Sequence, residues 1–191
     1  FISDAHIGWG SEEEDRARQD RLIDFLRAIR EDAEALYVVG GLFDFWFEYR
    51  SVVPRSGARV LFELYNLIEA GVPVGCTPGN HDLWIGTFLS REVGVTLLPR
   101  RSVVHHQGVR ICLDHGDDLL GGGLYRLVKR VLLNPACIAL FRLLHPDVGE
   151  VGVAGRQVFA RVSLRLRVAD EVQARRIAAG RFKVGHRLSA G

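Results

Sequence analysis

Residues 37–49 read YVVGGLFDFWFEY, and this stretch decides the class of fold. A short run of β-branched and aromatic residues, typical of a buried strand, ends in Gly40 and Gly41. An acidic residue, Asp44, and a group of aromatic residues follow within a few positions. Because α/β proteins carry their binding residues at the carboxyl ends of strands, we expect a functional site here.

Strand and helix patterns alternate on both sides of this stretch. Ser11 and Glu14 have the spacing of a capping box and precede an amphipathic helical pattern. The sequence further predicts strands over 1–3, 35–40, 72–77 and 181–185, a hairpin over 102–114, and helices over 60–68, 124–144 and 157–179. We therefore expect an α/β layered fold in which mixed β-sheets are flanked by helices.

The composition is that of one soluble domain covering residues 1–191. The chain is 48% hydrophobic and 25% charged, as ordinary globular proteins are. It holds no apolar run long enough to span a membrane and no signal-peptide pattern. It opens on Phe1, inside an apparent strand, and contains no Met, so we expect the natural start to be missing.

Three cysteines, Cys76, Cys112 and Cys137, lie far apart without CxxC spacing. A sparse, odd set argues against a disulfide framework and against a zinc finger, and it suits the reducing cytoplasm. We expect all three to be small buried hydrophobic residues.

The charge is unevenly distributed along the chain. Residues 1–100 hold ten Arg and sixteen acidic residues, a net −6, whereas residues 101–191 hold fifteen Lys or Arg and seven acidic residues, a net +8. A basic half suggests an anionic partner such as phosphate, nucleic acid or a lipid headgroup. A solvated basic surface without a partner is the alternative.

Four short motifs follow predicted strands, and together they indicate a metal site. Asp, Asn and His supply oxygen and imidazole ligands, a mixture that suits Mn²⁺, Fe²⁺ or Zn²⁺ better than Ca²⁺. Each motif alone is weak, but the ordered set is specific. The motifs are Asp4-Ala5-His6, Gly79-Asn80-His81-Asp82, His115-Gly116-Asp117 and Gly185-His186-Arg187.

In their order these motifs resemble the signature of the calcineurin-like metallophosphoesterases. The stretches GLFDFWFEY, TPGNHDLW, HGDDL, LYRLVKR, NPACIALFRLLHP and VGHR are similar to the UDP-2,3-diacylglucosamine pyrophosphate hydrolases of lipid A biosynthesis, in the branch found in Bacteroidetes. The resemblance covers nearly the whole chain. Members of the family usually continue past the last motif, so we expect the chain to be truncated at its end as well.

The resemblance implies a site with two metal ions, commonly Mn²⁺, that hydrolyses the substrate pyrophosphate to UMP and 2,3-diacylglucosamine 1-phosphate. Two cations activate water and neutralise the charge that develops on phosphate. By position, Asp4 and His6 would bind the first metal. Asn80, His115 and His186 would bind the second.

The resemblance also implies a catalytic pair and identifies two departures. His81 would contact the phosphate or the leaving oxygen, oriented by Asp82. The family has an Asp that bridges both metals where this chain has Gly41, and a His ligand where it has Leu188. We expect their loss to impair catalysis, because too few anionic ligands remain to offset the repulsion between two cations. At its spacing, Asp44 is expected to support the loop.

The basic half contains a helical insertion, residues 119–180, that the resemblance identifies as an acyl-chain cap. The 124–144 pattern is basic and amphipathic, which suits either an anionic membrane surface or ordinary packing. Phe45, Trp46, Phe47 and Tyr49 could likewise form core or line the substrate cleft. The substrate-binding residues implied within the insertion are Tyr125, Arg165 and Arg167.

These observations favour a peripheral hydrolase on the cytoplasmic face of the inner membrane, acting on a lipid-linked nucleotide sugar. One alternative is a metallophosphoesterase that acts on nucleotides or phosphoproteins, although a soluble substrate needs no hydrophobic cap. A second is an inactive lipid-nucleotide binder, which the substitutions Gly41 and Leu188 favour. A nucleic-acid partner is not expected, because aromatic and basic residues do not alternate along a groove-sized stretch. The oligomeric state is left open.

Overall fold

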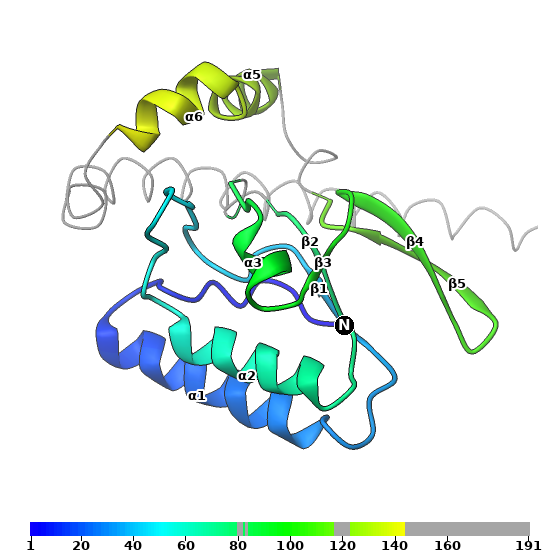
Figure 1. Ribbon diagram of the computed structural model, residues 1–191. Helices are drawn as coiled ribbons and strands as arrows, with labels where there is room; N and C mark the ends of the chain where they lie inside the picture. The colour runs from blue at the N-terminus through cyan, green and yellow to red at the C-terminus, as the bar shows by residue number, and fades with distance from the viewer. Residues whose placement is uncertain (80–81, 83, 117–122, 144–191) are drawn as a thin grey trace, which may run out of the picture. The chain divides into compact units, whose positions relative to one another are not determined.

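The computed structural model describes residues 1–79, 82, 84–116 and 123–143 (Figure 1). The chain divides into two compact units, residues 1–115 and residues 116–191. The first unit contains a parallel sheet, an antiparallel hairpin and helices. The predicted mixed α/β class is therefore confirmed.

A three-stranded parallel sheet lies at the centre of the first unit (Figure 1). Val39 on one strand is paired with Thr77 on the next, so these two strands end at the same edge. Ile2 forms a parallel bridge with Val38, and the predicted first strand is thus a single bridge beside the sheet. The strands, in spatial order, are β1 (Leu36–Val39), β2 (Val74–Thr77) and β3 (Thr96–Leu97).

Two helices, α1 (Glu12–Ala28) and α2 (Ala58–Glu69), lie side by side and cover one face of this sheet (Figure 1). α1 starts at the predicted capping box, in which the N–H of Glu14 donates to Oγ of Ser11 at 3.3 Å and the N–H of Ser11 donates to Oε2 of Glu14 at 2.9 Å. Both helices bury apolar residues at helical intervals, which is why they pack on the sheet. These residues are Ile23, Leu26, Val60, Leu64 and Leu67.

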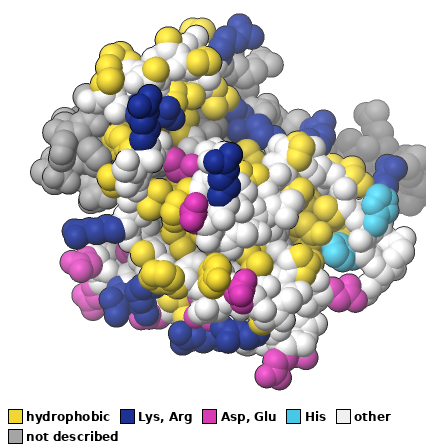
Figure 2. All heavy atoms as spheres, in the orientation of Figure 1, with side chains coloured by type: hydrophobic (Ala, Val, Ile, Leu, Met, Phe, Trp, Pro, Cys, Tyr) yellow, Lys and Arg dark blue, Asp and Glu magenta, His cyan; other side chains and the backbone are white. Residues whose placement is uncertain are grey.

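The outward surface of α1 and α2 carries acidic and basic side chains close together (Figure 2). Ion pairs connect the two helices, with Arg59 Nη2 at 2.6 Å from Asp20 Oδ1 and Arg27 Nε at 3.2 Å from Glu63 Oε2. Glu63 is buried, although the side chain of Arg27 is 61% exposed, and the Arg59–Asp20 pair is exposed on both sides and contributes little to stability.

The predicted hairpin is confirmed as β4 (Arg101–His106) paired antiparallel with β5 (Val109–Asp114). Nε2 of His106 lies 2.9 Å from the hydroxyl of Tyr37, and Nδ1 of His115 lies 2.9 Å from the carbonyl oxygen of Val39. Both partners belong to β1. The hairpin is thereby connected to the central sheet, and the end of β5 is brought next to the end of β1.

Two short elements were not predicted from the sequence. They are the helix α3 (Phe88–Arg91) and the strand β3, with four and two residues. Elements of one turn or one residue pair are too short for a periodic pattern to form.

The aromatic residues after β1 are mostly core. Trp46 and Phe47 are fully buried, and the rings of Phe43 and Trp46 stack with centroids 4.3 Å apart. This decides between the two interpretations for Trp46 and Phe47 in favour of packing. Phe45 and Tyr49 are half-buried, and a role in lining the cleft stays a prediction for them.

The expectation that all three cysteines are buried is wrong. Cys76 is buried in β2, whereas Cys112 is exposed and Cys137 is half-buried. Side chains alternate between the two faces of a strand. Leu113 of β5 points to the buried face, and Cys112 consequently points to the opposite, exposed face.

In the second unit the structure describes two helices, α5 (Gly123–Leu132) and α6 (Pro135–Arg142). The predicted interruption between them is confirmed, and Oδ1 of Asn134 accepts the N–H of Ala136 at 2.9 Å as a helix cap. The helix predicted over 157–179 and the strand predicted over 181–185 lie outside the described residues. None of the helices in the described ranges has the length and apolar character needed to cross a bilayer.

Candidate metal centre

The candidate centre lies where β1 ends. After Val39 the chain turns through Gly40 and Gly41, with φ of 71° and 65°. The N–H of Asp4 donates to the carbonyl of Gly40 at 3.2 Å, and the N–H of His6 donates to that of Gly41 at 2.9 Å. The loop that carries the first motif is therefore attached directly to the glycine turn.

Asp4 and His6, the two residues predicted to bind the first metal, face each other. Oδ1 of Asp4 lies 3.5 Å from Nε2 of His6. Both residues have positive φ, 54° and 45°, which non-glycine residues seldom adopt. Backbone strain of this kind persists where the surrounding structure enforces it, and it is concentrated at functional sites.

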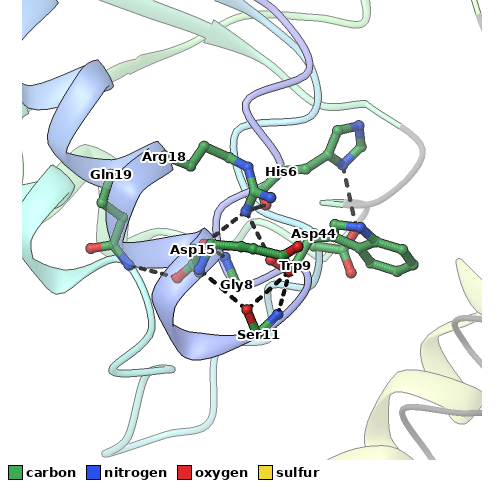
Figure 3. Close-up of polar contacts among 9 residues, drawn as sticks. His6, Gly8, Trp9, Ser11, Asp15, Arg18, Gln19 and Asp44 are labelled. Carbon is green, nitrogen blue, oxygen red and sulfur yellow. Dashed lines mark hydrogen bonds and ion pairs between the residues drawn. The ribbon is translucent and has the colours of Figure 1, made fainter.

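Asp44 contacts the other nitrogen of the same imidazole. Its Oδ1 lies 3.4 Å from Nδ1 of His6, and its side chain is only 19% exposed (Figure 3). A carboxylate on one nitrogen of a histidine fixes the ring and leaves the other nitrogen for a metal. In this arrangement Nε2 of His6 is the nitrogen directed toward Asp4. Asp44, which was expected to support the loop, thus contacts the imidazole of His6 directly.

Asp4 is held in the ionised state that a cation requires. Its hydrogen bond with His6 lowers the pKa of the carboxyl from 3.8 to about 2, with burial opposing the shift. Hydrogen bonding to Ser3 and the charge of His115 lower the pKa further. Hydrogen bonds and positive charge both favour the carboxylate over the neutral acid.

His115 lies at the same edge. Its Nδ1 is 2.9 Å from the carbonyl oxygen of Val39, which fixes the orientation of the ring. His115 and Asp4 line a common pocket of about 190 Å³, which also includes Ser3 and Asp114. The structure therefore places Asp4 beside His6 and in one pocket with His115.

Position 41 faces this group, although it offers no side chain. A Cβ at Gly41 would lie 3.2 Å from Oδ1 of Asp4 and 3.1 Å from its Cα. A side chain at residue 41 would thus be directed at the Asp4 carboxylate. The role of a carboxylate at position 41, which the family resemblance implies, stays a prediction.

Asp82 is fully buried and joins two loops. Its Oδ1 accepts the N–H of Gly79 at 2.6 Å and its Oδ2 accepts the N–H of Leu42 at 3.1 Å. Burial raises the pKa of this carboxyl above its ordinary value, and the backbone donors offset part of the rise. Its expected pairing with His81 stays a prediction, because His81 lies outside the described residues.

α1 supports the loop that follows His6 (Figure 3). Nη1 of Arg18 donates to the carbonyls of His6 and Trp9 at 3.2 and 2.9 Å. Oδ1 of Asp15 accepts the N–H of Gly8 at 2.6 Å. Sequence reasoning missed Arg18 and Asp15, because a charged residue on a helix carries no local signal of the loop that it contacts.

The remaining predicted site residues are not placed. Tyr125 belongs to α5, and its contact with substrate stays a prediction. Within the described ranges, no three His, Cys, Asp or Glu side chains lie close enough together to hold a metal ion. The predicted residues that lie outside those ranges are Asn80, His81, Arg165, Arg167, His186 and Leu188.

The described donors fit a divalent transition-metal ion in kind. One carboxylate and two imidazoles are the ligands that Mn²⁺, Fe²⁺ and Zn²⁺ share. They fall short in number and charge, because Asp4 is the one anionic group among the three and Gly41 adds none.

Comparison with known proteins finds relatives that share one name. The chain is 36% identical over 153 residues to a UDP-2,3-diacylglucosamine hydrolase of Porphyromonas gingivalis, covering 76% of this chain and 56% of the relative. It is 36% identical over 145 residues to the Pectobacterium atrosepticum protein of the same name, covering 75% of this chain and 58% of the relative. The chain thus spans a little more than half the length of these two relatives.

A third relative is covered more fully. The chain is 30% identical over 184 residues to the UDP-2,3-diacylglucosamine hydrolase of Proteus mirabilis, which is 96% of this chain and 68% of the relative. No protein-family model matches the chain. On the strength of these relatives, and of the strand-end motifs that the structure brings together, the chain belongs to the family of UDP-2,3-diacylglucosamine hydrolases.

Proposed function

We propose that this chain hydrolyses the pyrophosphate of UDP-2,3-diacylglucosamine to UMP and 2,3-diacylglucosamine 1-phosphate, as a step of lipid A synthesis. The observation that carries the proposal is the position of Asp4 at the edge where β1 ends, beside His6 and in one pocket with His115. The names of the relatives support the substrate.

The proposed cofactor is a pair of divalent metal ions, with Mn²⁺ the first choice. Asp4 and His6 would hold one, and Asn80, His115 and His186 would hold the other. Such a pair lowers the pKa of water and offsets the charge on a phosphate under attack. The contacts of Nδ1 of His6 with Asp44 and of Nδ1 of His115 with the Val39 carbonyl support the assignment, since a contact at one ring nitrogen fixes the orientation of a histidine ligand.

His81 is proposed to contact the phosphate or the leaving oxygen. It follows Asn80 in the loop after β2, and the carboxylate of the adjacent Asp82 anchors that loop to the turn after β1. A histidine fixed in such a loop can donate a proton to the departing phosphate oxygen.

The finer architecture is part of the proposal. It is a layered metallophosphoesterase fold with residues 119–180 inserted as a helical cap over the acyl chains. Tyr125, Arg165 and Arg167 are its proposed contacts with the substrate.

We further propose that the chain acts at the surface of the inner membrane, on its cytoplasmic side. α5 and α6 expose apolar side chains, with Leu127 on α5 57% and Leu140 on α6 68% exposed. Arg130 and Arg142 lie on the same helices. Exposed apolar residues beside cations suit an anionic bilayer surface, where the acyl chains of the substrate reside.

A second candidate function is binding of the lipid nucleotide without hydrolysis. Gly41 favours it, because the site loses the carboxylate that two cations would share.

Release of UMP from UDP-2,3-diacylglucosamine in the presence of Mn²⁺ tests the proposal. We expect slow turnover by this chain and faster turnover by Gly41→Asp, which returns the missing carboxylate. If Gly41→Asp binds Mn²⁺ and cleaves other phosphoesters but never this substrate, the assigned substrate is wrong. If the unaltered chain already matches its relatives in rate, the missing carboxylate does not limit catalysis.

A further inference from the structure

The buried carboxylate of Asp82 contacts two turns that are far apart in the sequence. Oδ1 accepts the N–H of Gly79 at 2.6 Å, and Oδ2 accepts the N–H of Leu42, forty residues away, at 3.1 Å. The side chain is 0% exposed, so these charge-assisted bonds form without competition from water.

One of the amides that Asp82 binds, that of Leu42, belongs to a peptide group that also binds the first motif. The peptide between Gly41 and Leu42 donates its N–H to Asp82 and accepts the N–H of His6 through its carbonyl, at 2.9 Å. The preceding peptide, between Gly40 and Gly41, accepts the N–H of Asp4 at 3.2 Å. One short hydrogen-bonded chain therefore runs from the carboxylate to the backbone of His6, and the adjacent peptide of the same turn binds the backbone of Asp4.

Hydrogen bonds in series strengthen one another, because each polarises the peptide that forms the next. Asp4 and His6 need such support, since both have positive φ. The turns also approach too closely for other residues, because a Cβ at Gly79 would lie 2.7 Å from the nitrogen of Gly41. The carboxylate and the glycines together fix the two turns against each other.

We propose that Asp82 is a positioning residue, which sets the backbone of Asp4 and His6 through the peptides of the Gly40–Leu42 turn. It acts in addition to any contact with His81. The consequence for metal binding rests on the function proposed above, whereas the positioning itself can be measured in the metal-free protein.

Amide hydrogen exchange in metal-free protein tests the inference, with Asp82→Asn as the variant. Asn keeps the shape but replaces one accepting oxygen with a donor, which faces an N–H. We expect exchange at the amides of Asp4 and His6 to accelerate about tenfold or more, while that of Leu64 in α2 changes far less.

Glu48→Gln is the matched control. The carboxylate of Glu48 accepts the N–H groups of Gly86 and Phe88 at 2.9 and 3.0 Å and so joins the same two loops, away from Asp4. This variant should leave exchange at Asp4 and His6 unchanged. Equal effects of the two variants, or acceleration at Leu64 as large as at Asp4, would overturn the inference.

Two further measurements guard against a variant that does not fold and separate the two proposals. Scalar couplings across hydrogen bonds in the unaltered protein should connect the Leu42 nitrogen with the Asp82 carboxylate carbon, and the His6 nitrogen with the Gly41 carbonyl carbon. Their absence would overturn the inference.

Mn²⁺ binding by the unaltered protein and by Asp82→Asn separates the two proposals. If the exchange effect is found but neither protein binds Mn²⁺, positioning stands and the proposed function fails. If Mn²⁺ binds both proteins equally and exchange is unchanged, the inference fails alone.

Discussion

At the scale of single residues, the candidate centre depends on side chains that orient other side chains. Asp44 contacts Nδ1 of His6, and the Val39 carbonyl contacts Nδ1 of His115. Asp82 accepts the backbone N–H groups of Leu42 and Gly79, in the turns after β1 and β2. Because the motifs follow strands, the sequence could predict that Asp4 and His115 lie at the same edge, where they line one pocket. It could not predict the partner of Asp82, since nothing near residue 82 encodes a contact with Leu42.

Asp44→Asn tests the orienting role at this scale. The amide removes the negative charge that holds Nδ1–H of His6, so we expect Mn²⁺ affinity to fall by about 10–100-fold. Isothermal titration calorimetry measures the affinity. Asp24→Asn, an exposed acid on α1, is the control and should bind Mn²⁺ as the unaltered chain does. An equal loss of Mn²⁺ affinity in both variants would show that the net charge of the protein, and not the contact of Asp44 with His6, determines the affinity.

At the scale of helices and strands, the sequence predicts the elements that nearby residues encode. It does not predict the elements that depend on contacts with distant loops. The capping box at Ser11, the hairpin with its turn at Gln107-Gly108 and the break at Asn134-Pro135 are all encoded within a few residues, and all three were predicted. α3 and β3 were missed because neighbouring loops determine them. The N–H of Phe88 at the start of α3, for example, donates to Glu48, forty residues earlier.

Ser11→Ala tests the contribution of the cap to stability. Loss of the Oγ acceptor leaves an N–H at the start of α1 without its partner, and we expect the free energy of unfolding to fall by about 1 kcal/mol. Urea denaturation followed by circular dichroism measures it. Ser51→Ala, at an exposed position outside any helix, should change stability little. Equal losses in both variants would contradict the role of the cap.

The same box gives a pH dependence. The Ser11 N–H, and then the Ser11 side chain, lower the pKa of Glu14 below 4.5. A carboxyl with a lowered folded-state pKa stabilises the protein above the unfolded-state value, and this contribution is lost as pH falls through the folded-state value. Ser11→Ala removes only the side-chain bond, so a carbon-13 titration should show the Glu14 pKa moving part of the way back toward 4.5. If the pKa of Glu14 is the same in Ser11→Ala as in the unaltered chain, the Ser11 side chain does not contribute to lowering it.

At the scale of the whole molecule, the uneven charge has a measurable consequence. Residues 101–191 carry a net +8, so binding to vesicles that contain anionic lipid should weaken as salt rises from 50 to 500 mM, in the manner of screened charges (about 10 Å Debye length at 0.1 M). Co-sedimentation measures this binding. Vesicles of neutral lipid serve as the control, and equal binding to both kinds of vesicle would argue against an anionic surface as partner.

We propose that the edge where β1 ends is a metal centre from which one carboxylate is missing at residue 41. Mn²⁺ titration of the unaltered chain, Gly41→Asp and Gly41→Asn tests it most directly, because both variants carry the same strain at φ 65° and differ in charge alone. We predict that Gly41→Asp binds Mn²⁺ about tenfold or more tightly than Gly41→Asn, which binds like the unaltered chain. Equal affinity of the two variants for Mn²⁺ would contradict the account.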